Sequence, residues 1–388
     1  MTNIAIEGLS LSLGTFALDN IEVALDGGQI LVVLGPNGSG KSVLLETIAG
    51  FHRPDAGRIL IRGIDVTRLP PERRRVAFVV QNFGLFPHLT VEQNVRLALG
   101  PHAKDKRSGV LSPLAGDAAA LLSYFGVSHL AARTPGRLSP GEKQRVALAR
   151  ALAANPDLFL FDEPFSALDS QTREQLRDDL LSLLRRICLP AIFVTHDHTD
   201  ALTLADRVLV LRNGKTVQVG TADDVYRRPS DAFVARFSGV ENILTGRTGA
   251  AQGNRLPVAV GDIVLQAVKP SSPPGAEVQV CIRAEEVRLR DARSAQDSEW
   301  RENRFTARVA NIRRMGAVVR VELEGPCRLA CCLLTPQLQE MRLERGSSVE
   351  VSIAAEALHL IPAGAQEVSS RLAAAAAASQ RRVRVASP

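Results

Sequence analysis

The sequence predicts an α/β domain built on a parallel sheet, followed by a separate all-β domain. Up to about residue 235, short continuous apolar runs alternate with helical patterns, which is typical of parallel strands joined by crossover helices. After about residue 240, short runs of alternating apolar and polar residues follow one another, separated by turn residues. The length of 388 residues also favours more than one folded unit.

Three apolar runs in the first part are predicted as buried strands, because each is continuous rather than alternating. They are Ile30–Leu34, Leu158–Phe161 and Ala191–Val194. Residues 90–155 are mostly helical in pattern, so we expect a helical subdomain over about 84–157 within a first domain of residues 1–235. Residues 101–116 contain Gly, Pro and Lys and are expected to form an exposed loop.

The second part is predicted as a β domain over residues 236–364, with a disordered or frayed tail at 365–388. The strands expected from alternation are Val278–Arg283, Phe305–Val309, Val318–Leu323 and Val349–Ile353. The segments Leu244–Arg247 and Thr306–Val309 resemble each other, which indicates two related halves. The turns between strands carry Gly316, Gly325 and Gly346.

Charge and cysteine content exclude several classes of protein. The net charge of +6 is mildly basic, but no dense Lys/Arg block with interleaved aromatic residues is present, so we expect no nucleic-acid partner. The five cysteines have no paired spacing and are expected to be reduced thiols, with Cys331 and Cys332 on opposite sides of a strand. No apolar run approaches the roughly 20 residues that cross a bilayer, and no signal-peptide pattern opens the chain. We therefore expect a soluble or peripheral protein.

A glycine-rich loop between a predicted strand and a predicted helix is the strongest chemical signal. Its backbone N–H groups are expected to surround phosphates, aided by the N-terminus of the helix expected over Val43–Ala49. The lysine supplies a full positive charge to the β and γ phosphates, and the serine hydroxyl after it ligates Mg²⁺. The candidate nucleotide-binding residues are Gly35, Pro36, Asn37, Gly38, Ser39, Gly40, Lys41 and Ser42. By itself this loop does not choose among kinases, GTPases and transport ATPases.

Two carboxylates end the strand that begins at Leu158. Asp162 stands at the strand tip, where it is expected to hold Mg²⁺ directly or through water. Glu163 follows, where a carboxylate is able to polarise the attacking water. With the glycine-rich loop, this pair favours a nucleotide hydrolase over a solvated acidic turn.

Four further segments resemble motifs of the ABC ATPases and occur in that family's order. Leu138–Arg145 resembles the signature motif, and Ser166–Asp169 resembles the D-loop with Asp169 at its end. Gln81 resembles the Q-loop glutamine and His196 the switch histidine. The resemblance covers residues 1 to about 235 and implies a catalytic set of Glu163, His196 and Gln81.

The resemblance also implies how two chains cooperate. Signature residues of one chain would cover the ATP bound by a second chain, so a head-to-tail homodimer is expected, and a helix N-terminus facing a phosphate is electrostatically favourable. The signature residues concerned are Ser139, Pro140, Gly141 and Glu142. The Mg²⁺ ligands expected are Ser42, Gln81 and Asp162.

Two positions depart from the family pattern. Pro140 replaces a glycine, which is tolerable at a first helical position because the missing N–H would be unpaired there. The aromatic residue that usually stacks on adenine is not evident, since Leu13 occupies the expected place and Phe16 is the nearest ring. Phe16 is therefore the candidate for adenine stacking.

Among ABC proteins, the importer ATPases are the nearest in pattern. Gln81–Val91 resembles the importer segment that receives a permease helix, with Phe83, Leu85, Phe86 and Leu89 as candidate groove residues. Exporters commonly fuse membrane helices to the ATPase, and soluble ABC proteins usually carry tandem ATPase units, neither of which is present. The partners implied are integral membrane permease subunits and, indirectly, a periplasmic or extracellular substrate-binding protein, at the cytoplasmic face of the inner membrane.

The second part of the chain refines the resemblance. Phe237–Leu244 and Cys281–Val287 resemble an OB-like, TOBE-type accessory domain of importer ATPases, with Ala284 in place of a proline. Ser42–His52 and Arg313–Val321 are most similar to molybdate/tungstate importer ATPases. Sulfate/thiosulfate, iron, polyamine and sugar importers are the alternatives. The likeness implies either an oxyanion ligand in the C-terminal domain or a domain that only cements the homodimer.

Overall fold

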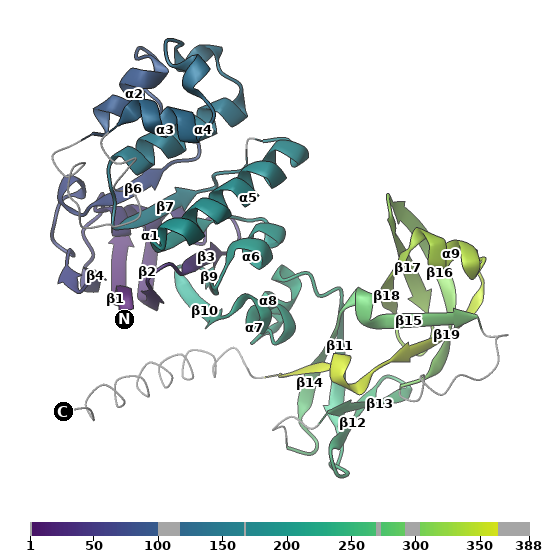
Figure 1. The fold of residues 1–388 in the computed structure, drawn as a ribbon. Coiled ribbons are helices and arrows are strands. Elements are labelled where there is room, and N and C mark those ends of the chain that lie inside the picture. The colour runs from purple at the N-terminus through teal and green to yellow at the C-terminus, as the bar shows by residue number, and fades with distance from the viewer. Residues whose placement is uncertain (1, 100–116, 167, 269–272, 292–302, 364–388) are drawn as a thin grey trace. The chain divides into compact units, whose positions relative to one another are not determined.

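The computed structural model describes residues 2–99, 117–166, 168–268, 273–291 and 303–363 (Figure 1). The expected loop 101–116, the D-loop residue Ala167 and the expected tail 365–388 lie outside the described residues. By its internal contacts the chain divides into two compact units between Asp223 and Asp224.

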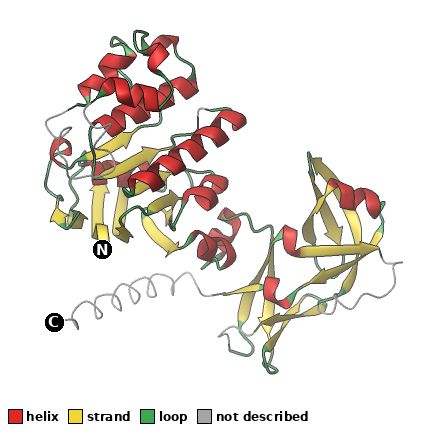
Figure 2. Cartoon of the chain, viewed as in Figure 1, coloured by secondary structure: helices red, strands yellow, loops and turns green. Residues whose placement is uncertain are grey.

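The described strands of the first unit form one ten-stranded sheet in the order β5-β4-β1-β2-β10-β9-β3-β8-β7-β6. Figure 2 shows the strands in yellow and the helices in red. Strands β9, β3, β8, β7 and β6 run parallel, as predicted from the continuous apolar runs, whereas β1, β2 and β4 pair antiparallel. The strands are β1 (Thr2–Leu13), β2 (Phe16–Asp26), β3 (Ile30–Leu34), β4 (Ala56–Ile61), β5 (Ile64–Asp65), β6 (Val76–Val79), β7 (Leu158–Asp162), β8 (Ala191–Val194), β9 (Arg207–Arg212) and β10 (Lys215–Gly220).

Helices α2, α3 and α4 pack on one another (Figure 1) and lie within residues 84–157, where the helical subdomain is expected. Helix α1 begins at Lys41, two residues before the predicted start, because Gly40 adopts a left-handed conformation directly before it. The helices are α1 (Lys41–Ala49), α2 (Val91–Leu97), α3 (Ala118–Tyr124), α4 (Pro140–Ala153), α5 (Ser170–Ile187), α6 (His198–Leu204), α7 (Ala222–Arg227) and α8 (Ala232–Phe237), with short 3₁₀ turns at Pro71–Arg73, Ser128–Leu130 and Pro135–Arg137.

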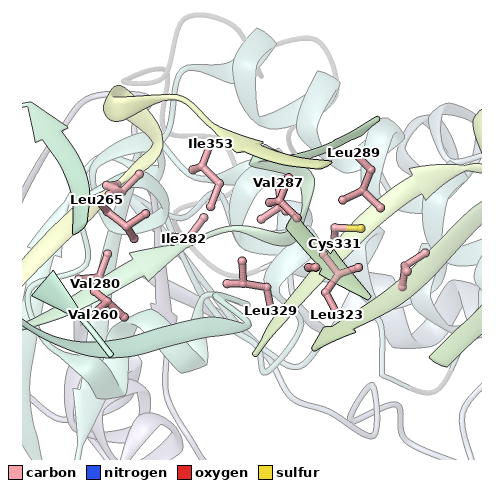
Figure 3. Close-up of a cluster of buried hydrophobic side chains, with 14 of the residues drawn as sticks. Val260, Leu265, Val280, Ile282, Val287, Leu289, Leu323, Leu329, Cys331 and Ile353 are labelled. Carbon is pink, nitrogen blue, oxygen red and sulfur yellow. The ribbon is translucent and has the colours of Figure 1, made fainter. Parts of the chain in front are cut away.

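The second unit contains two five-stranded antiparallel sheets among the described residues, in the orders β13-β12-β11-β14-β20 and β15-β19-β16-β17-β18. Their inner faces share one buried apolar cluster, part of which Figure 3 shows. The elements are β11 (Asn242–Thr248), β12 (Arg255–Val260), β13 (Ile263–Val268), β14 (Glu277–Ile282), β15 (Val287–Asp291), β16 (Phe305–Met315), β17 (Val318–Glu324), β18 (Leu329–Leu334), α9 (Thr335–Glu340), β19 (Ser348–Ile353) and β20 (His359–Pro362), with 3₁₀ turns at Ala284–Glu286 and Ala355–Ala357.

The two halves of this unit repeat one pattern and exchange their last strands. Strand β14 is followed by a 3₁₀ turn and by β15, and β19 is followed in the same way by β20. Strand β15 pairs with β19 of the second sheet, whereas β20 returns to pair with β14 of the first. Each sheet is therefore completed by a strand from the other half, which makes the folding of the two halves interdependent.

Two asparagines occupy equivalent places in this repeat. Asn242 donates from Nδ2 to the carbonyls of Ile282 (3.1 Å) and Ala330 (2.9 Å), and its Oδ1 accepts from the N–H of Ala330 (2.6 Å). Asn303 makes the same three kinds of bond with the carbonyls of Ile353 and Gln266 (both 3.0 Å) and the N–H of Gln266 (2.6 Å). Each side chain thus joins backbone groups of both sheets.

We expect Asn242→Ala to lower the free energy of unfolding of the second unit by about 1–3 kcal/mol, because buried backbone groups lose their partners. Asn303→Ala is expected to cost less, since Asn303 is only half-buried whereas Asn242 is buried. Calorimetric unfolding of the full chain measures both. The control is Asn311→Ala, because Asn311 is exposed and bonds only to its neighbour's N–H; equal effects of all three variants would contradict the asparagine bridges.

Candidate functional site

The glycine-rich loop joins the buried strand β3 to helix α1 and packs closely on its surroundings. A Cβ atom on Gly35 would lie 2.3 Å from the carbonyl oxygen of Leu211, so no larger residue fits there. Gly40 has a φ of +100°, and a Cβ atom there would lie 2.4 Å from Cζ of Phe16. These two glycines let the backbone fold tightly ahead of the helix N-terminus, which is the geometry of an anion cradle.

Lys41, the first residue of α1, is almost fully buried at 6% exposure. Its ammonium group donates to the carbonyls of Gly35 (2.9 Å) and Pro36 (3.1 Å), across the loop. Burial lowers the pKa of Lys41, while the carboxylates of Glu163 and Asp162 act in the opposite direction. A cation is therefore fixed beside the cradle and faces the two acids.

The ends of β7 and α1 bring oxygen donors together. The Ser42 hydroxyl donates to Oδ1 of Asp162 at 3.2 Å. Burial raises the pKa of Asp162, with the hydrogen bond from Ser42 opposing and the charge of Glu163 adding to the rise. A hydroxyl and a carboxylate are the hard ligands that Mg²⁺ prefers, so this pair fits the expected metal.

The side chains of Glu163, Gln81 and His196 also lie close together. His196 Nδ1 lies 3.1 Å from Oε1 of Glu163, and Gln81 Nε2 lies 3.5 Å from Oε2. Gln81 lies 3.4 Å from the hydroxyl of Ser166 as well. Glu163 has a φ of +47°, a left-handed conformation that is uncommon for glutamate, and its N–H donates to the carbonyl of Val194. The carboxylate thus lies between the side chains of Gln81 and His196.

The signature residues form the N-terminus of α4. Ser139 is the N-cap, its hydroxyl accepts from the N–H of Glu142 (3.3 Å), and the Glu142 carboxylate accepts from the N–H of Ser139 (2.6 Å). The hydrogen bond from the Ser139 N–H lowers the pKa of the Glu142 carboxyl, and the two bonds together form a capping box. Pro140 is the first helical residue, which confirms the expectation from its missing N–H. A Cβ on Gly141 would lie 3.1 Å from Cγ2 of Thr172 on α5.

Arg173 joins the D-loop to the switch-histidine loop, a connection that the motifs alone do not reveal. Asp169 caps α5 by accepting from the N–H of Thr172 at 3.0 Å. One turn along, Arg173 donates to the carbonyl of Leu168 (3.4 Å) and to the carboxylate of Asp197 (3.1 Å), the residue after His196. The only sequence signal was an arginine one turn after the cap.

Phe16 lies at the start of β2, with its ring against Gly40 of the cradle. It is half-buried and packs partly on the core cluster of the first unit. Leu13 pairs with it across the β1–β2 hairpin. The structure therefore places the candidate ring beside the phosphate loop, and adenine stacking by Phe16 stays a prediction.

Arg283 holds α7 and α8 to the β domain. Its guanidinium lies 3.3 Å from the centroid of the Tyr226 ring and donates to the carbonyls of Tyr226 and Ser238. The Tyr226 hydroxyl donates to Glu285 at 2.8 Å. These contacts explain why α8 and most of α7 belong to the second unit. That unit begins at Asp224, upstream of the boundary expected at 235/236.

The comparisons with known proteins cover both units. The ABC transporter family model matches residues 18–166, and the TOBE domain model matches residues 280–361. The molybdate/tungstate import ATP-binding protein WtpC of Pyrococcus horikoshii is 39% identical over 360 residues, covering 92% of this chain and 100% of that protein. The sulfate/thiosulfate import ATP-binding protein CysA of Mycobacterium tuberculosis is 45% identical over 230 residues, 59% of this chain and 64% of that protein. A solved nucleotide-free ATP-binding cassette from an ABC transporter has a TM-score of 0.54 and 25% identity, covering 61% of this chain and 98% of that chain.

A phosphate cradle after a buried parallel strand, with acids at the end of a strand in the same sheet, defines a P-loop nucleotide hydrolase. The chain belongs to the ATP-binding subunits of ABC transporters and carries a C-terminal TOBE domain. It is the ATPase subunit of an ABC importer and hydrolyses ATP to drive transport. Subunits of this family work with membrane permeases. Within the described part of this chain, no helix has the length and apolarity to cross a bilayer.

Proposed function

We propose that the chain energises the import of molybdate or tungstate. The observation that carries this is a 39% identity to a molybdate/tungstate import ATPase that extends over 92% of the chain. One sulfate/thiosulfate import ATPase is 45% identical over 59% of the chain, and another is 38% identical over 84% of the chain. The molybdate/tungstate relative matches over the larger share of the chain, which supports molybdate/tungstate, with sulfate/thiosulfate as the second candidate.

The proposed catalytic unit is a homodimer in which two copies enclose two ATP molecules. The cradle Gly35–Ser42 of one copy holds the triphosphate, and Ser139 and Gly141 of the other copy cover it. Glu163 accepts a proton from the attacking water, while Gln81 and His196 orient that water and the γ-phosphate. Binding closes the dimer, and hydrolysis lets it reopen.

The proposed Mg²⁺ ligands are Ser42, Asp162 and Gln81. Ser42 and Asp162 already lie within hydrogen-bond distance of each other, and the amide oxygen of Gln81 belongs to the same class of hard ligand. When bound, the metal neutralises charge that develops on the phosphates. The side chains of Lys41 and Ser42 then orient the triphosphate from the helix end.

For the assembly we propose a peripheral position at the cytoplasmic face of the inner membrane, against integral membrane permease subunits served by a substrate-binding protein outside. The ATPase function belongs to residues 1–235. Residues 236–364 are proposed to bind the transported oxyanion and hold the complex at rest, supported by the arginine-bearing strands β15 and β16. No nucleic acid is involved.

A reconstituted complex with its permease tests both proposals. We expect molybdate and tungstate, with binding protein present, to stimulate ATP hydrolysis severalfold, whereas sulfate at the same concentration does not. Excess molybdate on the cytoplasmic side is expected to depress hydrolysis. Stimulation by sulfate alone would transfer the assignment to the second candidate, and an unchanged rate at millimolar cytoplasmic molybdate would remove the regulatory role.

A further inference from the structure

Residues 83–90, which we call the docking segment, are held from one side by Arg150 of α4. Arg150 donates from Nη1 to the carbonyl of Gly84 (2.5 Å) and from Nη2 to the carbonyl of Phe83 (3.0 Å). Its guanidinium also lies 5.8 Å from the centroid of the Phe86 ring. One forked side chain thus binds two successive carbonyls and one aromatic face of the same segment.

Asn94 of α2 holds the segment from the other side. It is fully buried, accepts from the N–H of Phe86 (2.8 Å) and donates to the carbonyl of Phe86 (3.1 Å). The same amide group donates to the carbonyls of Leu89 (3.2 Å) and Thr90 (3.0 Å). Because α2 packs against α4, both side chains belong to one rigid group of helices.

We call the hydrogen bonds of Arg150 and of Asn94 to the docking segment the two clamps. The backbone conformation of the segment explains why they are needed. Phe83 and Gly84 are successive left-handed residues, with φ of +61° and +58°. A phenylalanine holds this conformation only where its surroundings impose it, and the carbonyls of these two residues are the ones that Arg150 binds. Burial lowers the pKa of Arg150, which fits a guanidinium withdrawn from water onto the backbone.

The segment presents an outward face. The sequence predicts four groove residues, but Phe83 is buried at 9% exposure and belongs to the core, because its backbone turns it inward. Phe86 is 41% exposed. The clamps therefore fix the segment from inside while Phe86 remains available to a permease.

We propose that Arg150 and Asn94 are positioning residues that make the docking segment move as one body with the signature helix α4. Ser139 and Arg150 lie at opposite parts of that helix, about 16 Å apart by its rise per residue. Closure of the Ser139 turn on nucleotide is then passed along the helix to residues 83–90. This inference rests on the proposed dimer closure and names the parts that transmit it.

Hydrogen exchange of the full chain tests the inference, with Glu163→Gln as background so that bound ATP persists. In that background, MgATP is expected to slow exchange both at residues 139–142 and at residues 83–90. Adding Arg150→Ala should speed exchange of residues 83–90 about tenfold without nucleotide, since two charge-assisted bonds are lost. The slowing of residues 83–90 by MgATP should fall severalfold, while residues 139–142 stay protected.

Arg150→Lys is the second variant, because it keeps the positive charge but not the forked guanidinium that binds two carbonyls. It is expected to give a smaller loss of the MgATP-dependent slowing than Arg150→Ala. Arg96→Ala is the control, since Arg96 on α2 makes only a surface pair with Glu92. Unchanged nucleotide protection of residues 83–90 in both Arg150 variants overturns the inference. If MgATP does not protect residues 139–142 in the Glu163→Gln chain itself, the proposed dimer closure is overturned. That failure is distinguishable from failure of the present inference, because it is seen with Arg150 unchanged.

Discussion

Glu163→Gln is expected to bind MgATP as the unchanged chain does and to lose hydrolysis by roughly 10²–10⁴-fold, the usual contribution of a general base. The amide keeps the size of the carboxylate, and its oxygen remains able to accept from Gln81 or His196, which lie 3.5 Å and 3.1 Å from the two carboxylate oxygens. It has no basic oxygen to take a proton. ATP should therefore stay bound, and a closed dimer should accumulate.

Nucleotide binding, steady-state hydrolysis and light scattering with and without ATP measure the three consequences. Glu72→Gln is the matched control. Glu72 is exposed in a 3₁₀ turn, so this substitution makes the same chemical change at the surface. Hydrolysis by Glu163→Gln at the rate of this control would show that another group acts as base. Loss of hydrolysis without an ATP-dependent dimer would support Glu163 as the general base but contradict the proposed closure of the dimer.

The parallel strands and the cradle were predictable because their chemistry is local. Five consecutive apolar residues at Ile30–Leu34 require burial on both faces, and the loop after them carries its glycines, lysine and serine at fixed spacing. The meeting of Gln81, Glu163 and His196 was predictable only through the resemblance, because they lie on three separate parts of the chain. Parallel strands end at one edge of the sheet, which is why three such distant residues converge.

The clamps and bridges were not predictable, since they depend on backbone carbonyls rather than on side-chain patterns. Arg150 looks like any helical surface arginine until the left-handed turn at Phe83 shows which carbonyls it binds. Asn242 and Asn303 belong to no sequence motif. Their equivalence is visible only in the structure, where they donate to the carbonyls of Ile282 and Ile353, the last residues of β14 and β19. The exchange of β15 and β20 between the two sheets likewise has no signal in the local sequence pattern.

Lys41→Ala is expected to weaken MgATP binding by about 10–100-fold, because charge-assisted hydrogen bonds to a phosphate are worth roughly 1.5–3 kcal/mol. The ammonium is the one charge that the structure buries at the cradle, and it already faces two carboxylates, whose negative charge repels a triphosphate. Removing it leaves Glu163 and Asp162 uncompensated beside the incoming phosphates. Repulsion then adds to the lost bonds.

The change removes none of the backbone N–H donors of the cradle, so it separates the contribution of the charge from that of these donors. Lys41→Met keeps the buried stem and removes only the ammonium, and it should weaken binding as much as alanine does. Lys215→Ala, at an exposed pair with Asp19, is the control and should bind normally. Calorimetric titration with a slowly hydrolysed ATP analogue measures all three. Normal affinity in both Lys41 variants would mean that the N–H groups of residues 35–42 bind the phosphates without help, and that the lysine only closes the loop onto Gly35 and Pro36.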